Sequence, residues 1–167
     1  MSVAGDPRAR LLELLTERSF ERRRVVLASG RESDFFIDCK QTVLTAEGHF
    51  LVGKVMLAIV RELGPCDAVA GVALGGCPLA SATALTSMHA GSAIDAVYVR
   101  KAQKDHGSQR LVEGNDRLPE GATITLLEDV TTTGGSSLKA VAVLRDVGYA
   151  VRNIVTLVDR LEGGREA

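Results

Sequence analysis

The sequence predicts an α/β fold in which a parallel central sheet is flanked by helices. Short apolar runs rich in Val, Ile and Ala show no clean alternation with polar residues, as expected for strands covered on both faces. These runs occupy residues 67–72, 93–99, 122–127 and 151–158. Helical segments at 81–90 and 136–147 alternate with them. Such alternation is typical of a parallel sheet with right-handed crossovers.

The second helical segment carries both an apolar face and a stop signal. Its apolar positions are spaced for one side of a helix. They are Leu138, Val141, Leu144 and Val147. Gly148 follows at the position where a left-handed C-cap residue is needed. We therefore expect this helix to pack on the sheet and to end at residue 147.

The first part of the chain has a different pattern and is predicted to form a small N-terminal hood. We expect one domain over residues 1–167, with the hood at 1–40 and the core at 41–167. Within the hood, a leucine-rich helix and a short aromatic strand are predicted at 8–18 and 35–37. A long helix is then expected at 45–63, because Thr45 suits its entry and Gly64-Pro65 ends it.

Composition and charge restrict the class of protein. The 167 residues, 46% hydrophobic and 25% charged, suit one globular domain with a substantial core. A formal net charge of −1 provides no global field for nucleic acid or a membrane surface. The cysteines, Cys39, Cys66 and Cys77, form no CxxC pair, which argues against a disulfide scaffold or a structural zinc site. With no apolar signal core and no run near the ~20 apolar residues of a membrane span, a cytoplasmic location is expected.

The most informative segment is TITLLEDVTTTGGSS at residues 123–137. An apolar run ends in Glu128-Asp129, and hydroxyls and glycines follow before a helix begins. Free backbone N–H groups and the positive end of the helix dipole suit a phosphomonoester. The two carboxylates repel phosphate and lie where ligands bind in open α/β sheets, so they require a cation or the vicinal hydroxyls of a sugar. The segment therefore predicts a site for ribose 5-phosphate.

A capped strand–helix turn with a solvated acidic pair is the plainer interpretation. The coincidence of acidic pair, hydroxyl run and helix start disfavours it, and the absence of GK[ST] and GxGxxG disfavours nucleotide hydrolysis or dinucleotide binding. The segment resembles the signature of type I phosphoribosyltransferases. That resemblance implies that Glu128 and Asp129 hold the ribose hydroxyls. It places the 5′-phosphate against Val130, Thr131, Thr132, Thr133, Gly134, Gly135 and Ser136.

A basic cluster, RKAQKDHG, occupies residues 100–107. Charge runs are usually solvated loops, but this chain is otherwise nearly neutral, and a departing pyrophosphate needs concentrated positive charge. RKxxKDHG followed by Glu-Gly resembles the catalytic loop of orotate phosphoribosyltransferases. The resemblance implies a homodimer in which loop 100–114 reaches the partner's site. It implies that Lys104 is the main transition-state cation and joins Asp129 in catalysis, and that pyrophosphate is bound by Lys104, Arg100, Lys101 and His106.

Two further segments resemble the parts of this family that recognise the base. SGRESDFF at 29–36 resembles the SGRxSxYF hood, which implies that Phe36 flanks the planar orotate ring, although core aromatics explain the segment equally well. DRLEG at 159–163 matches DRxEG, and a guanidinium at Arg160 suits the carboxylate of orotate. Thr132 is implied as another orotate contact.

A last segment, GVALGGCPLA at 71–80, resembles the pyrophosphate loop of the family. Gly75 and Gly76 allow close approach of the backbone to phosphate oxygens. Two positions depart from a common version of the pattern. Ala28 lies before Ser-Gly-Arg where many members carry Lys, and Gly75 or Gly76 lies where many carry Lys in this loop. These departures bear on how the substrate is bound.

The resemblance implies transfer of the phosphoribosyl group from phosphoribosyl pyrophosphate to orotate, giving orotidine 5′-monophosphate in de novo pyrimidine biosynthesis. It implies Mg²⁺ as cofactor, held mainly by substrate and water with no dedicated set of protein ligands. A regulatory protein of the same fold that binds phosphoribosyl pyrophosphate and nucleic acid is an alternative, which the lack of a wider basic patch disfavours. A purine phosphoribosyltransferase would lack both RKxxKDHG and SGRxS.

Overall fold

The computed structural model describes residues 5–26, 30, 32–101, 111–114 and 116–166. A five-stranded sheet lies at its centre, with strand order β7-β6-β5-β8-β9. Its strands are β5 (Ala68–Val72), β6 (Asp95–Val99), β7 (Val112–Glu113), β8 (Thr123–Thr131) and β9 (Ala150–Asp159). Pairing is parallel throughout except between β6 and β7, which are antiparallel. The predicted parallel sheet is thus confirmed, with one antiparallel edge strand added.

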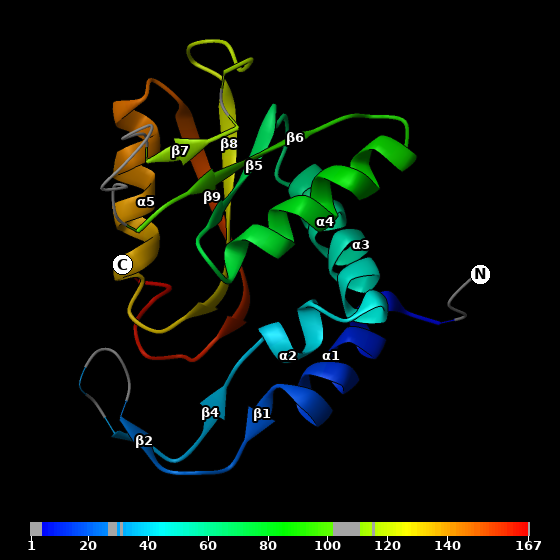
Figure 1. Ribbon diagram of the computed structural model, residues 1–167, viewed down its shortest axis with the longest axis vertical. Coiled ribbons are helices and arrows are strands. Elements are labelled where there is room, and N and C mark those ends of the chain that lie inside the picture. Colours follow the sequence, from blue (N-terminus) through cyan, green and yellow to red (C-terminus); the bar gives the residue numbers. More distant parts are fainter. Residues whose placement is uncertain (1–4, 27–29, 31, 102–110, 115, 167) are drawn as a thin grey trace.

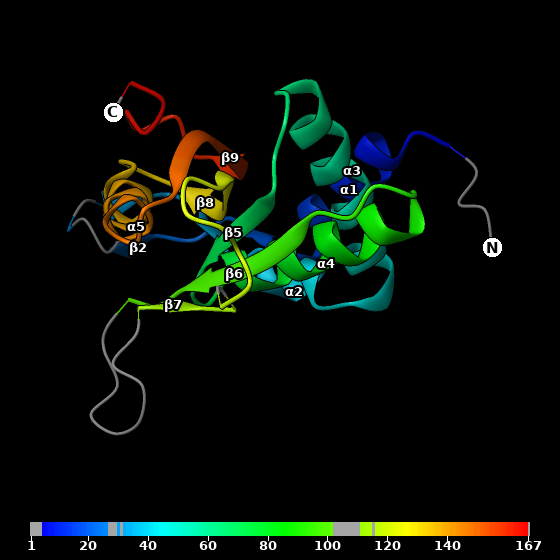
Figure 2. The ribbon, with the colours of Figure 1, turned by 90° about the horizontal axis from the view of Figure 1, so that it is seen from above.

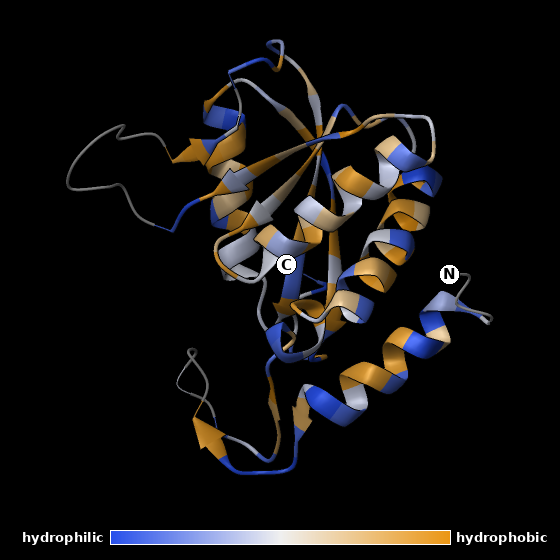
Figure 3. Ribbon diagram, turned by 45° about the vertical axis from the view of Figure 1, so that its right-hand side comes forward, coloured by the Kyte–Doolittle hydropathy of each residue, from blue (hydrophilic) through white to orange (hydrophobic). Residues whose placement is uncertain are grey.

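Helices cover both faces of the sheet. On one face lie α3 (Ala46–Glu62) and α4 (Gly76–His89), and on the other lies α5 (Gly135–Asp146) (Figure 2). Because neighbouring residues of a strand point to opposite faces, Val69 and Leu127 pack toward α3 and α4, whereas Ala70 and Leu126 pack toward α5. Figure 3 shows polar and apolar residues distributed around α3 as expected for a helix with one face on the core.

The N-terminal elements lie below the carboxyl ends of the parallel strands (Figure 1). They comprise α1 (Pro7–Arg18), β1 (Phe20–Glu21), β2 (Val25–Val26), β3 (Glu32–Ser33), β4 (Phe36–Ile37) and α2 (Lys40–Val43). Strand β1 pairs with β4, and β2 pairs with β3, so this segment forms two short antiparallel ribbons. Leu11 and Leu14 of α1 are buried in the same core cluster as α3. The hood is therefore joined to the core through α1.

Helix ends follow the sequence signals. Thr45 is the N-cap of α3, where its hydroxyl accepts a hydrogen bond from the Gly48 N–H at 3.1 Å. Gly148 adopts a left-handed φ of 99° after α5, as predicted. Among the described residues, no helix combines the length and the apolar character that a membrane crossing requires.

The apolar face predicted for α5 is wrong at two positions. Val141 and Leu144 are buried, but Leu138 and Val147 are 45% and 42% exposed. The buried face instead includes Ser137 and Ala140. Ser137 Oγ donates to the buried carboxylate of Glu128 at 2.9 Å, so this polar contact lies on the packed face of the helix.

Candidate active site

The predicted phosphate loop lies between β8 and α5 at the carboxyl edge of the sheet. Gly134, the N-cap of α5, has a left-handed φ of 78°, which favours glycine. The first N–H groups of α5 have no acceptor within the helix and remain available to an anion. A cavity of about 720 Å³ opens beside them. From the loop it is lined by Val130, Thr132, Thr133, Gly134, Gly135 and Ser136.

Thr131 differs from the rest of the predicted phosphate set. Its side chain is turned into the sheet, and its hydroxyl lies 2.6 Å from the Thr156 hydroxyl. Only 8% of Thr131 is exposed, and its carbonyl accepts a hydrogen bond from the Arg160 N–H at 3.0 Å. Thr131 therefore joins the phosphate loop to the end of β9.

The acidic pair lies inside β8, because the strand continues to Thr131 instead of ending before Glu128. Glu128 is 5% exposed, and its Oε2 accepts hydrogen bonds from Ser137 at 2.9 Å and Ser136 at 3.2 Å. Burial, together with the neighbouring charge of Asp129, raises the pKa of Glu128 above its ordinary range. In this arrangement the Glu128 carboxyl group accepts from two hydroxyls of the first turn of α5.

Asp129 lies against the predicted pyrophosphate loop. A Cβ placed on Gly75 would be only 2.0 Å from Asp129 Oδ2, and one on Gly76 would be 2.6 Å from the Leu127 carbonyl oxygen. A side chain on Gly76 would clash with backbone atoms, and one on Gly75 would require the Asp129 carboxylate to move. The absence of the lysine found in many family members therefore fits the close approach of Asp129 to this loop.

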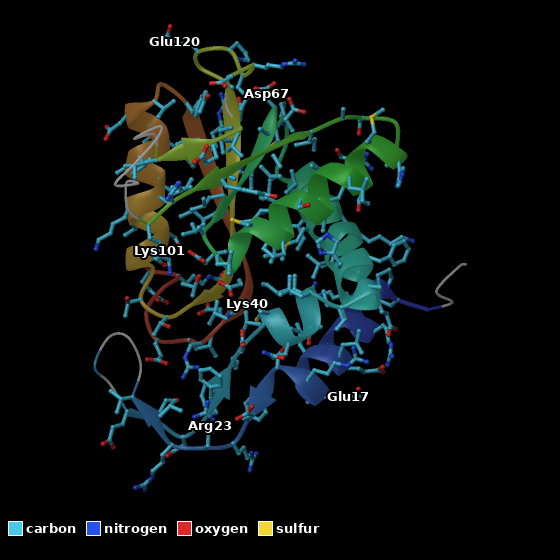
Figure 4. The ribbon with its side chains drawn as sticks, viewed as in Figure 1. Glu17, Arg23, Lys40, Asp67, Lys101 and Glu120 are labelled. Atoms are coloured by element: carbon cyan, nitrogen blue, oxygen red, sulfur yellow. The ribbon has the colours of Figure 1, made fainter. Side chains whose placement is uncertain are left out.

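The basic cluster is only partly described. Arg100 Nη1 lies 3.2 Å from Glu113 Oε1, which joins the ends of β6 and β7, and Lys101 is exposed. Both residues line the 720 Å³ cavity, and Figure 4 labels Lys101 beside α5. Lys104 and His106 lie outside the described residues. Strand β7 lies within the loop predicted at 100–114 and was not predicted from the sequence.

Arg160 is held by the hood. Its side chain is 3% exposed, and its Nη2 donates to Ser33 Oγ at 2.7 Å and to the Phe35 carbonyl at 3.4 Å. Its Nε donates to Glu162 Oε1 at 2.9 Å. The aromatic partner of Arg160 is Phe35, whereas the predicted base-flanking residue, Phe36, lies beneath the guanidinium of Arg23 at 4.3 Å. The contacts bring the end of β9 and the hood together.

Three positions were missed by sequence reasoning. Ser33 and Phe35 lie within the hood motif, but nothing in their spacing identifies them as partners of Arg160. Lys139 lines the cavity from the second turn of α5. Its spacing, three residues after Ser136, provides a signal, since residues three or four apart share one face of a helix.

The phosphate loop, the adjoining acidic pair and the close-packed glycine loop on a parallel sheet define the phosphoribosyltransferase class. A family model described as "Phosphoribosyl transferase domain" matches residues 46–167. An orotate phosphoribosyltransferase from Sorangium cellulosum is 64% identical over 168 residues, covering 100% of this chain and 88% of that protein.

Solved structures agree with the sequence relatives. The Mycobacterium tuberculosis orotate phosphoribosyltransferase in complex with Fe(III) dicitrate has a TM-score of 0.79 at 40% identity, covering 96% of this chain and 89% of that one. The same enzyme in complex with 5-phospho-alpha-D-ribosyl 1-diphosphate has a TM-score of 0.76 at 36% identity, covering 96% and 88%. The chain belongs to the orotate phosphoribosyltransferase family.

Proposed function

We propose that the protein transfers the 5-phosphoribosyl group from phosphoribosyl pyrophosphate to orotate, giving orotidine 5′-monophosphate and pyrophosphate. The observation that carries this proposal is the hydrogen bond between the Arg160 N–H and the Thr131 carbonyl, 3.0 Å long. This backbone hydrogen bond joins the loop suited to ribose 5-phosphate to the segment that carries Arg160, whose guanidinium suits a carboxylate-bearing base. The placement of both groups on one edge supports a reaction between a phosphoribosyl donor and orotate. This activity belongs to de novo pyrimidine biosynthesis.

The proposed roles follow the positions of the residues along this edge. Asp129, with Glu128 beside it, binds the ribose hydroxyls. The 5′-phosphate is held by backbone N–H groups and hydroxyls within residues 130–136. Pyrophosphate leaves toward the Gly75-Gly76 loop and a cationic set formed by Arg100, Lys101, Lys104 and His106. Orotate contacts Thr132, Arg160 and Phe36.

The buried guanidinium of Arg160 restricts how orotate binds. Nε and Nη2 already donate to Glu162, Ser33 and Phe35, whereas Nη1 donates to none of the described residues. The orotate carboxylate is therefore expected at Nη1. Bidentate binding at Nη1 and Nη2 requires that the hood contacts of Nη2 be exchanged for the substrate.

Transfer at the anomeric carbon needs no nucleophilic side chain, because a ring nitrogen of orotate attacks. Positive charge develops on the ribose while negative charge grows on the departing pyrophosphate. The residues of this chain position both groups and provide preorganised charge of opposite sign. Lys104 is assigned to the pyrophosphate side and Asp129 to the ribose side.

Mg²⁺ is the proposed cofactor, and the donor groups present fit a loosely held ion. Asp129 is half-buried at the sheet edge and provides carboxylate oxygens, which Mg²⁺ prefers. Among the described residues, no three His, Cys, Asp or Glu side chains gather as a ligand set. Because Mg²⁺ usually keeps several waters and binds through one or two carboxylates, we assign most of the ligands to substrate and water and one to Asp129. When bound, Mg²⁺ neutralises charge on the pyrophosphate group.

We further propose a cytosolic homodimer in which loop 100–114 reaches the partner's site. The partial exposure of Arg100 and the exposure of Lys101 support this assignment, because charged groups at the base of that loop face away from the core. A mass measurement in solution and a mixed dimer test it. Two inactive variants, one at Asp129 and one at Lys104, should regain activity when their subunits are exchanged. No recovery from a verified mixed dimer would contradict shared sites.

The activity is tested by mixing the purified protein with orotate, phosphoribosyl pyrophosphate and Mg²⁺. Loss of the ultraviolet absorbance of orotate, abolished by EDTA, is the expected result. Adenine, hypoxanthine and uracil are tested in parallel through pyrophosphate release. Turnover of another base and not orotate would overturn the roles given to the hood and Arg160. Binding of phosphoribosyl pyrophosphate without turnover of any base would favour a regulatory function.

A further inference from the structure

Three cationic residues line the 720 Å³ cavity beside the phosphate loop. They are Arg100, Lys101 and Lys139. Among the described residues that line the cavity, none is acidic. Arg100 is paired with Glu113, but Lys101 and Lys139 form no hydrogen bond or ion pair with any part of the chain that the structure describes. Two cations without a partner among the described residues, beside a third that is paired, favour an anionic ligand.

The position of Lys139 on α5 indicates which anionic group binds in this cavity. Side chains of a helix lean toward its N-terminus and cover the preceding turn. We therefore expect the exposed Lys139 side chain to extend toward Gly135 and Ser136, where the free N–H groups of the first turn also lie. The cavity is lined by residues 132–136, assigned to the 5′-phosphate, and by Arg100 and Lys101, assigned to pyrophosphate, but not by Gly75 or Gly76. Lys139 lies on α5, the helix that begins within residues 132–136, which favours the 5′-phosphate.

We propose that Lys139 binds the 5′-phosphate of the phosphoribosyl group. The proposal rests on the function given above and adds a residue to it. Lys139 provides the positive charge on the α5 side of the phosphate, while backbone N–H groups of the loop contact the remaining oxygens. This chain has Ala28, Gly75 and Gly76 where many relatives carry lysine, so a cation from α5 adds positive charge to the substrate site.

A structural role for Lys139 is disfavoured by its surroundings. It is exposed, it has no partner among the described residues, and it lies near the positive end of the α5 dipole. Without ligand, its charge is repelled by Lys101 and by the helix. Replacement by Met, a good helix former, should leave the ligand-free protein as stable as before or more stable. If Lys139 stabilised the fold, its replacement by Met would instead lower the stability of the ligand-free protein.

The test compares Lys139→Met with Lys139→Arg and with Lys54→Met. Lys54 lies on α3 over the ring of Phe50, outside this cavity, and its replacement gives the same net charge. Binding of ribose 5-phosphate and of pyrophosphate is measured separately by calorimetry, and KM for phosphoribosyl pyrophosphate is measured by turnover. These ligands separate the 5′-phosphate from the leaving group.

Lys139→Met should weaken ribose 5-phosphate binding and raise KM for phosphoribosyl pyrophosphate by about fivefold, as for one partly exposed charge-assisted contact. Pyrophosphate binding and kcat should stay within about twofold, the size of a change of a few tenths of a kcal/mol. Lys139→Arg and Lys54→Met should resemble the wild type.

Unchanged KM and ribose 5-phosphate affinity in Lys139→Met would overturn the proposal, as would an equal loss of pyrophosphate binding. If wild-type protein converts no base but its ribose 5-phosphate affinity depends on Lys139, the binding role stands and the enzymatic function is wrong. Thermal unfolding adds a further readout. The stabilisation by ribose 5-phosphate should be smaller in Lys139→Met than in Lys54→Met.

Discussion

The guanidinium of Arg160 lies over the ring of Phe35, with its central carbon 4.2 Å from the ring centroid. The same guanidinium donates to the Phe35 carbonyl and to Ser33, so three contacts join the end of β9 to the hood. The Phe35 ring in turn lies 5.7 Å from the ring of Phe20 in β1. Arg160, which is proposed to bind orotate, thus also holds the hood against the end of β9.

Arg160→Lys should weaken both of these roles. Lysine keeps the charge but cannot stack as a planar group or form the same forked hydrogen bonds. We expect KM for orotate to rise about tenfold, corresponding to about 1.4 kcal/mol, with KM for phosphoribosyl pyrophosphate little changed. Steady-state kinetics with each substrate varied in turn provide the measurement. An unchanged orotate KM in both Arg160→Lys and Arg160→Ala would remove Arg160 from the carboxylate site.

The hood contact itself is tested by a double-mutant cycle between Arg160 and Phe35. Arg160→Lys and Phe35→Leu should each lower the melting temperature, and their effects should not add. The expected coupling is about 1 kcal/mol, since Arg160 is buried and Phe35 is half-buried. Additive effects would contradict an energetic link between hood and core at this position. Phe36→Leu serves as the control, because its ring contacts Arg23 and not Arg160.

The glycine at position 75 is predicted to be required by Asp129. Gly75→Ala places a methyl group where the Asp129 carboxylate now lies, at 2.0 Å from Oδ2. We expect a loss of about 1–3 kcal/mol in unfolding free energy, as for other overpacked sites, together with reduced turnover. Denaturant unfolding and initial rates measure the two effects.

A second variant shows whether the clash is with Asp129. In the background of Asp129→Ala, Gly75→Ala should cost little stability, because the carboxylate is gone. Activity should remain low in that double variant. An equal stability loss in both backgrounds would place the clash elsewhere.

Much of the architecture could be predicted from local pattern, and the misses have physical causes. The runs at 67–72 and 122–127 are strongly apolar and give a clear strand signal because both faces are covered, whereas those at 93–99 and 151–158 give a weaker one. Strand β7 has two residues and exists only through pairing with β6, so no local pattern reveals it. The rotation of α5 depends on Ser137, whose hydroxyl reaches Glu128 from across the loop. A count of apolar residues cannot include that contact.

In the candidate site, too, the parts set by local sequence could be predicted and the parts set by tertiary contacts could not. The phosphate loop is contiguous in sequence, and its glycine, hydroxyl and helix-start signals lie within 15 residues, 123–137. The partners of Arg160 lie 127 and 125 residues away, at Ser33 and Phe35. Their contact depends on how the hood folds over the sheet edge. Such pairings arise from tertiary structure, and no residue spacing in the sequence predicts them.

Lys104 is expected to act mainly on the transition state. The residue lies outside the described part of the chain, and its role follows from the RKxxKDHG pattern. Lys104→Ala should lower kcat by about 10²–10³, the usual cost of losing one well-placed charge donor, with a much smaller change in binding of phosphoribosyl pyrophosphate. Single-turnover rates and equilibrium binding distinguish the two effects. A kcat near that of the wild type would contradict the assignment.

Glu128 is expected to reduce stability as the pH rises. Its pKa is raised in the folded state above the ordinary value of 4.5, because burial disfavours the charged form and Asp129 adds repulsion. The folded protein therefore binds more protons than the unfolded chain between the two pKa values. Its free energy of unfolding falls as the pH increases through that window, and the loss is complete above the raised pKa.

Glu128→Gln should abolish this contribution while keeping an oxygen that accepts from Ser137. The variant should gain in melting temperature relative to wild type as the pH rises from about 4, where the ordinary carboxyl group titrates, toward neutrality. Its turnover should fall, because the carboxylate is assigned to the ribose hydroxyls. Ser136→Ala provides the control, since it removes the longer of the two hydrogen bonds and leaves the charge in place. A difference in melting temperature between Glu128→Gln and wild type that does not change with pH would show that Glu128 is ionised equally in the folded and unfolded states.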